Sequence, residues 1–200
     1  MQPIRRIVGM VLLLALLGTG TAAAQWWTSL SYQPAAPLSN TKDFTDNFGW
    51  RGVGLDFKKQ VNPKVTVGLS FGWQVFEEQT DAVVSAFGVD ISGDQFRYVN
   101  SFPMLANLSY FLGKEGGLRP YVSANVGAYV MEHRLEIGLY AIEETNVHFG
   151  FAPEAGVAIP VQPNVAAVLS GRYNYALSAG SVDDQTYLSI GLGLAWTHGY

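Results

Sequence analysis

The sequence predicts an all-β protein, an eight-stranded antiparallel up-and-down transmembrane β-barrel. Apolar and small polar residues alternate with a period of two through most of the chain after residue 25, as in strands with two different faces. Short turns alternate with longer polar connections between the strands, as in barrels whose strands cross a bilayer. Charged residues make up only 14% of the 200 residues, whereas glycine (22 residues) and aromatic residues (13%) are abundant. This charged share is about half that of an ordinary soluble domain. The composition therefore suits a surface that faces lipid.

The first 24 residues have the features of a secretory signal peptide. Two arginines precede an apolar run from Ile7 to Leu17, and the alanines 22–24 form a small-residue cleavage site. The apolar run has about 11 residues, fewer than the roughly 20 that a spanning helix needs. We therefore expect export, removal of residues 1–24, and a mature outer-membrane barrel over residues 25–200 that begins at Gln25.

The alternation places eight strands after this segment. We expect them at about 26–33, 48–58, 64–75, 96–112, 120–130, 146–160, 165–175 and 187–196. In each strand one face carries Leu, Val, Ile and aromatic residues, and the other carries Gly, Ser, Thr, Asn and Gln. A polar, glycine-rich face makes a poor dry core but a good hydrated and tightly packed interior. We therefore expect the apolar face to point outward, to lipid.

The connections differ in length and in charge. Short turns are expected at 60–63, 113–117 and 161–164, longer loops at 34–47, 77–95 and 137–145, and a further short connection at 179–185. Most acidic residues fall at the long-loop end: Asp43, Asp46, Glu77, Glu78, Asp81, Asp90, Asp94, Glu132, Glu136, Glu143, Glu144, Asp183 and Asp184. This acidic rim is either a solvated loop set or a site for divalent cations that bridge to lipid phosphates.

Aromatic residues gather near the expected strand ends. They are Trp26, Trp27, Trp73, Tyr110, Tyr173, Tyr175 and Trp196. Amphipathic rings at these positions are typical of the interfacial girdles of a membrane barrel. We therefore expect them to lie on the outer surface, at the two edges of the bilayer.

Three stretches of the sequence resemble the small outer-membrane β-barrel family, the eight-stranded group of the OmpA transmembrane domain and OmpW. They are residues 117–127, residues 151–161 with the strand 165–175 that follows, and residues 189–196. The resemblance implies the outer membrane of a Gram-negative bacterium, with the short turns in the periplasm. It also implies contacts with outer-membrane lipids and lipopolysaccharide, and insertion aided by the barrel-assembly machinery and periplasmic chaperones.

The last of these stretches is similar to the family's insertion signal. The signal has a polar residue, a glycine two positions later, and apolar residues five and seven positions after the polar one. The matching residues here are Ser189, Gly191, Leu194 and Trp196. The chain ends on the aromatic Tyr200, where the family usually has Phe, and His198 departs from the pattern. The resemblance implies that these residues are read during assembly.

Two charged residues fall on the inner face of neighbouring strands. Glu154 and Arg172 flank a turn centred near Gln162 and Pro163, so antiparallel pairing places residue 154 opposite about 171–172. We therefore expect a structural ion pair between Glu154 and Arg172 in the lumen wall.

The remaining features argue against most catalytic and cofactor classes. The chain has no cysteine, which excludes a disulfide scaffold, a Cys-ligated metal and a cysteine nucleophile. It has no basic stripe to neutralise phosphates, which argues against nucleic-acid binding. His133, His148 and His198 lie outside the His–Ser spacing of a barrel lipid A deacylase, because none of them is two residues from a serine. We expect no catalytic, cofactor-binding or metal-binding residues.

The sequence favours a non-enzymatic outer-membrane barrel with a structural, envelope-integrity or surface-interaction role. Two alternatives stay open. One is a narrow, porin-like channel for small or hydrophobic solutes, as the resemblance to OmpW suggests. The other is a lipid A-modifying barrel enzyme. No protein partner is indicated.

Overall fold

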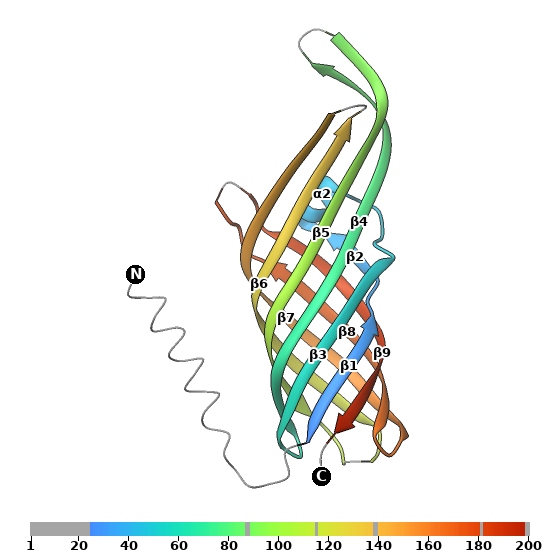
Figure 1. The fold of residues 1–200 in the computed structure, drawn as a ribbon, viewed down its shortest axis with the longest axis vertical. Helices are drawn as coiled ribbons and strands as arrows, with labels where there is room; N and C mark the ends of the chain where they lie inside the picture. The colour runs from blue at the N-terminus through green and yellow to red at the C-terminus, as the bar shows by residue number, and fades with distance from the viewer. Residues whose placement is uncertain (1–24, 87–88, 115, 138–139, 181, 199–200) are drawn as a thin grey trace, which may run out of the picture.

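The computed structural model describes residues 25–86, 89–114, 116–137, 140–180 and 182–198. Figure 1 shows a tall barrel of tilted strands, with β4 and β5 rising above its rim. The strands are β1 (Trp26–Tyr32), β2 (Ala35–Leu38), β3 (Arg51–Asn62), β4 (Val65–Ala86), β5 (Val89–Phe111), β6 (Arg119–Ile137), β7 (Tyr140–Gln162), β8 (Val165–Ala176) and β9 (Gln185–His198). Each pairs antiparallel with its neighbour, and β1 pairs with β9 to close the ring. The expected antiparallel barrel is confirmed.

The first two segments, β1 and β2, form one strand of the ring. Both pair with β9 in a single continuous register, with a break at Gln33 and Pro34. Pro34 has no N–H to donate, but its carbonyl accepts a hydrogen bond from the Ile190 N–H at 2.9 Å. The nine segments therefore make an eight-stranded barrel.

The three expected long loops are largely regular structure, so these expectations were wrong. The strands β4 and β5 remain paired to Ala86 and Val89, through the described part of the region 77–95. The strands β6 and β7 remain paired to Ile137 and Tyr140, through most of 137–145. Among the described side chains of these extensions, Glu77, Arg134 and Glu143 are charged, which interrupts the apolar alternation but leaves the backbone pairing intact. The region 34–47 holds β2 and a short helix.

That helix, α2 (Ser39–Phe44), lies at the long-strand end of the barrel (Figure 1). Thr41 is fully buried; its hydroxyl donates to Gln185 Oε1 at 2.8 Å and accepts from the Thr186 N–H at 2.9 Å. The Phe44 ring packs edge-on against His133, with ring centroids 5.3 Å apart. Because these partners lie on the inner face of the strands, α2 covers the mouth of the lumen.

The outer surface carries a belt of exposed apolar side chains, which we call the apolar belt. It includes Leu30, Phe57, Leu69, Phe71, Phe102, Met104, Leu108, Val122, Val126, Phe151, Leu169, Ile190, Leu192 and Leu194. The expected direction of the alternation, with apolar residues outward, is correct. Within the described ranges, no helix is long and apolar enough to cross a membrane.

Candidate functional site

The middle of the lumen holds four charged side chains. Asp56 and Lys58 come from β3, Glu154 from β7 and Arg172 from β8. Glu154 and Arg172 are directly opposite in the β7–β8 register. Arg172 Nε and Nη2 each lie 2.6 Å from Glu154 Oε2, and the two side chains are only 4% and 2% exposed. The structure thus brings together the two residues that the sequence singled out.

Asp56 and Lys58 extend this pair into a charge cluster. Asp56 Oδ1 lies 3.6 Å from Arg172 Nη2, and Asp56 Oδ2 lies 3.6 Å from Lys58 Nζ. The cluster therefore contains two cations and two carboxylates, with no net charge. Removing a charge from water is costly unless opposite charges and hydrogen bonds compensate for it, and here each charged group has such a partner.

Hydroxyl groups complete the partners of both carboxylates. The Tyr121 hydroxyl donates to Glu154 Oε1 at 2.7 Å, and the Ser29 hydroxyl donates to Asp56 Oδ2 at 2.7 Å. Further side chains continue the hydrogen bonds across the lumen: Ser70, Asn107, Ser109, Ser123 and Asn125. We call Ser29, Asp56, Lys58, Tyr121, Glu154 and Arg172 the lumen belt. A satisfied polar network of this kind rigidifies a core.

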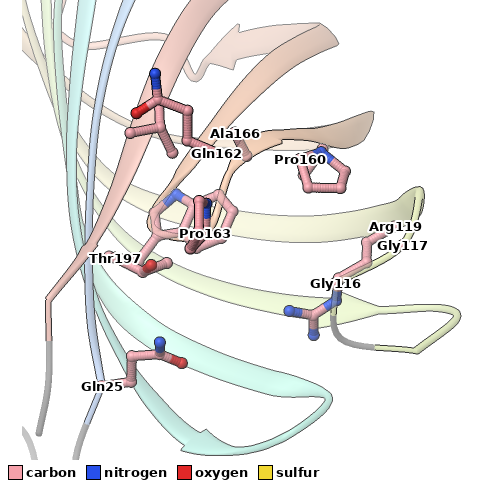
Figure 2. Close-up of a pocket in the computed structure, with 12 residues that line it drawn as sticks. Gln25, Gly116, Gly117, Arg119, Pro160, Gln162, Pro163, Ala166 and Thr197 are labelled. Atoms are coloured by element: carbon pink, nitrogen blue, oxygen red, sulfur yellow. The ribbon is translucent and has the colours of Figure 1, made fainter.

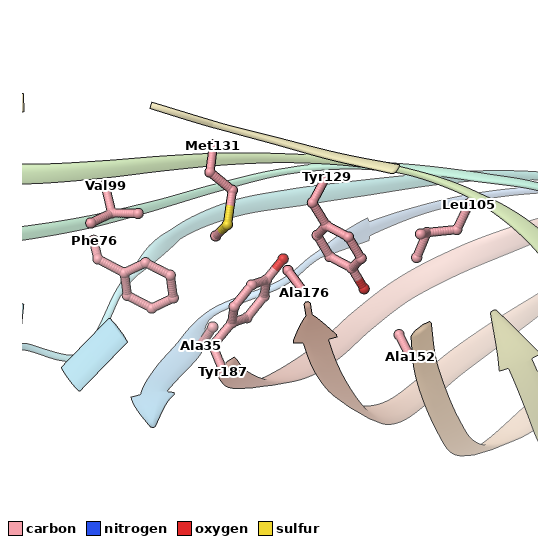
Figure 3. Packing of buried hydrophobic residues seen from close by; sticks show 9 residues of the cluster. All are labelled: Ala35, Phe76, Val99, Leu105, Tyr129, Met131, Ala152, Ala176 and Tyr187. Carbon is pink, nitrogen blue, oxygen red and sulfur yellow. The ribbon is translucent and has the colours of Figure 1, made fainter. Parts of the chain in front are cut away.

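Apolar side chains pack in the lumen on the α2 side of the lumen belt. Figure 3 shows this upper lumen cluster, which consists of Ala35, Phe76, Val99, Leu105, Tyr129, Met131, Ala152, Ala176 and Tyr187. Each of them is at most 2% exposed. The expectation of an inner face made of Gly, Ser, Thr, Asn and Gln is therefore correct only for the middle of the barrel.

A second group, the lower lumen cluster, packs at the short-turn end. It consists of Trp27, Phe111, Tyr121, Ala158 and Ala195. Trp27 is 8% exposed, and its ring centroid lies 5.5 Å from that of Phe111. Its assignment to an outer girdle was wrong, because Trp27 shares the inward parity of Ser29 on β1. Proximity to a strand end does not decide the face.

A pocket of about 140 Å³ opens at the short-turn end (Figure 2). The turn before β6 contributes Gly116 and Gly117, and β6 begins with Arg119. On the other side lie Gln162, the last residue of β7, and Pro163 of the β7–β8 turn. Trp27 and Ala158 line the pocket and also belong to the lower lumen cluster. Their side chains therefore separate the pocket from the lumen belt.

The residues of the expected insertion signal lie on β9, where the ring closes. Ser189 and Gly191 face the lumen, and Ser189 Oγ accepts a hydrogen bond from Asn174 Nδ2 at 3.2 Å. Leu194 faces outward and belongs to the apolar belt. Trp196 shares the outward parity of Leu194 on this strand, whereas Tyr200 lies outside the described residues. Their role in assembly stays a prediction.

The histidines have structural surroundings. His148 is fully buried, and its Nδ1 lies 2.8 Å from the Leu177 carbonyl oxygen. His133 packs against Phe44, and His198 is exposed at the end of β9. In the part of the chain that the structure describes, no group of three or more His, Asp or Glu residues could hold a metal ion.

Comparison with known proteins identifies relatives at the level of family and fold. A family model for the outer membrane protein beta-barrel domain matches residues 10–196. A comparison with curated proteins finds no match.

Solved structures of similar fold come from several bacteria. The chain is similar to Ail, the attachment invasion locus protein of Yersinia pestis, in complex with the heparin analogue sucrose octasulfate; the TM-score is 0.60 at 15% identity, over 88% of this chain and 100% of that chain. Neisserial surface protein A gives 0.53 at 15% identity, over 88% and 98%. Pseudomonas aeruginosa OprG gives 0.55 at 13% identity, over 90% and 99%. At these identities the likeness shows the fold.

Proposed function

Because the chain belongs to the outer membrane protein beta-barrel domain family, we propose that it is a non-enzymatic barrel with a structural and surface-interaction role. It lies in the outer membrane of a Gram-negative bacterium. Its apolar belt faces the lipid, so outer-membrane lipids and lipopolysaccharide are its immediate partners. By analogy with the family, the short turns face the periplasm and the long β4–β5 and β6–β7 hairpins face the outside.

The observation that carries this proposal is the filling of the lumen. The lumen belt contains the Glu154–Arg172 pair, whose side chains are at most 4% exposed. An apolar cluster packs on either side of the belt. An eight-stranded barrel has an interior that side chains can just fill. This packing supports a rigid membrane body over the narrow channel.

Single-channel recording of the refolded barrel in planar bilayers tests the proposal. We expect no steady conductance from the native protein. We also expect none from Arg172→Met, because the two apolar clusters block the lumen independently of the belt. Steady open steps in the native protein would contradict the proposal and favour the channel alternative.

Mass spectrometry of lipid A tests the third alternative, a lipid A-modifying enzyme. Lipid A from cells that produce the barrel should have the same mass as lipid A from cells that lack it. A deacylated or otherwise altered lipid A that depends on the barrel would contradict the non-enzymatic role.

We also propose that residues 1–24 are removed on export and that the assembly machinery reads the β9 signal. In support, β1 begins at Trp26, and the Gln25 carbonyl accepts a hydrogen bond from the Gln60 N–H at 2.8 Å. The wall of the barrel thus starts directly after the expected cleavage site. Leu194 and Trp196 lie on the outward face of the closing strand, where an insertion factor can reach them.

A further inference from the structure

The outer wall of the barrel contains a cleft of about 360 Å³, formed by β3, β4, β5 and β6. We call it the wall cleft. It is separate from the lumen, because its lining residues have outward parity on their strands. Its volume lies at the lower end of the range of about 300–1,000 Å³ that is usual for small-molecule sites.

The strand register explains how the cleft is built. Arg51 pairs with Val75, Val75 with Asn100, and Asn100 with Glu132, so these four residues form one row across four strands. In the next row toward the long-strand end, Tyr98 pairs with Arg134. Val75 is only 6% exposed although its position is an outward one, because the residues around it form the walls of the cleft.

The cleft begins where the apolar belt ends. On the membrane side, Trp73 stacks on Phe102 with ring centroids 6.4 Å apart, and both rings are exposed. Trp73 Nε1 also donates to Asn100 Oδ1 at 3.4 Å. Above this level the outward positions carry the charges of Glu132 and Arg134. The cleft therefore lies at the level of the lipid headgroups, next to the acyl chains.

The charges in the cleft do not favour a phosphate. Arg51 forms an ion pair with Glu77. Arg134 Nη2 lies 2.5 Å from Glu136 Oε1, and its Nη1 lies 3.1 Å from Glu143 Oε1. Both arginines are thus already neutralised, and Glu132 adds a further carboxylate to the lining. An anionic group would meet an excess of negative charge.

Hydrogen-bonding groups remain for an uncharged ligand. Arg134 Nε is buried and has no hydrogen-bond partner among the described residues. Glu132 and Asn100 supply oxygen acceptors, and the Trp73 and Tyr98 rings supply flat apolar surface. Aromatic faces carry partial negative charge and attract the polarised C–H groups on one side of a sugar ring. Sugar hydroxyls both donate and accept, so they match a carboxylate and an unpaired N–H in the same cleft.

We propose that the wall cleft binds the uncharged sugar headgroup of a glycolipid in the outer leaflet. The sugar ring stacks on Trp73 and Tyr98, and its hydroxyl groups form hydrogen bonds with Glu132, Asn100 and Arg134. The acyl chains of the glycolipid run along the apolar belt past Phe102. The proposal rests on the outer-membrane placement and orientation given under the proposed function.

The test uses the barrel labelled with fluorotryptophan and refolded into phosphatidylcholine nanodiscs that contain increasing fractions of diglucosyl diacylglycerol. Fluorine NMR follows Trp73, whose resonance should shift and saturate, while that of Trp26 at the other end of the barrel stays unchanged. Tyr98→Leu should weaken the apparent affinity by about threefold to tenfold. The control is Tyr110→Leu, an exposed tyrosine on the same face of β5 but outside the cleft, and it should leave the affinity unchanged.

Several outcomes would overturn the proposal. The first is that the Trp73 resonance does not shift with the glycolipid, and the second is that Tyr98→Leu and Tyr110→Leu change the affinity equally. The third is that phosphorylated lipid A binds more tightly than the neutral glycolipid, and the fourth is that free maltose binds as tightly as the glycolipid. The last two would assign the cleft to an anionic headgroup or to a soluble sugar. Conductance and lipid A mass are measured separately, so failure here is distinguishable from failure of the proposed function.

Discussion

Breaking the Glu154–Arg172 pair should destabilise the barrel unequally, depending on which partner is removed. Glu154→Gln leaves Arg172 with Asp56, 3.6 Å away, so the remaining cation keeps a partner. Arg172→Met leaves two carboxylates with only Lys58, and Glu154 keeps only the Tyr121 hydroxyl. Breaking a buried ion pair by removing one partner costs about 3–5 kcal/mol. We expect Arg172→Met to fall in this range and Glu154→Gln to cost about 2 kcal/mol, because its orphaned partner is compensated.

The double variant separates the pair energy from the cost of each change. Urea unfolding of the barrel in lipid vesicles, followed by tryptophan fluorescence, gives the free energy of unfolding of each variant. Because the two residues are in contact and buried, we expect a coupling energy of about 1–3 kcal/mol. The exposed pair Lys42–Asp46 is the control, with a coupling below about 0.5 kcal/mol. A coupling for Glu154 and Arg172 no larger than this control would refute the reasoning.

Four further predictions concern assembly, packing and processing. Leu194→Asp should lower the yield of folded barrel on unboiled gels, since a carboxylate on the lipid face costs up to about 2 kcal/mol; an unchanged yield would argue against the outward assignment. Gly68→Ala should lower the free energy of unfolding by about 1–3 kcal/mol, because the new Cβ would lie 2.6 Å from the Cα of Lys58, the residue opposite. Gly171→Ala is the control and should be neutral, because open space surrounds this glycine. Thr41→Val should speed amide hydrogen exchange in α2 by removing both of its hydrogen bonds to β9, at a cost of about 1–3 kcal/mol, and unchanged exchange would mean that other contacts hold the helix. Mass spectrometry of the mature protein should find Gln25 as the first residue, and an intact leader would show that processing fails.

Local patterns in the sequence were sufficient to predict the strands that form the wall of the barrel and the direction in which their two faces point. The period of two assigns each residue to a face, and it correctly placed the apolar face outward. The short β7–β8 turn sets the register of its two strands, so the opposition of Glu154 and Arg172 follows from residues close in the chain. The aromatic rule failed for Trp27 because strand parity, rather than distance from a strand end, decides the face.

The contents of the barrel depended on tertiary structure. Asp56 and Lys58 are more than 90 residues from Glu154 in the chain, and only ring closure and strand tilt bring β3 across the lumen to β7 and β8. The sequence does indicate that Asp56 and Lys58 face the lumen, since both occupy inward positions of one strand. It does not indicate which residues of other strands they contact. The helix α2 also depended on tertiary structure, because its polar sequence predicts a loop and the hydrogen bonds of Thr41 to β9 hold it in place. The wall cleft did too, because its row of four residues spans four strands. Hairpin register is set by the nearest turn, whereas contacts across a lumen are set by the diameter and stagger of the whole ring.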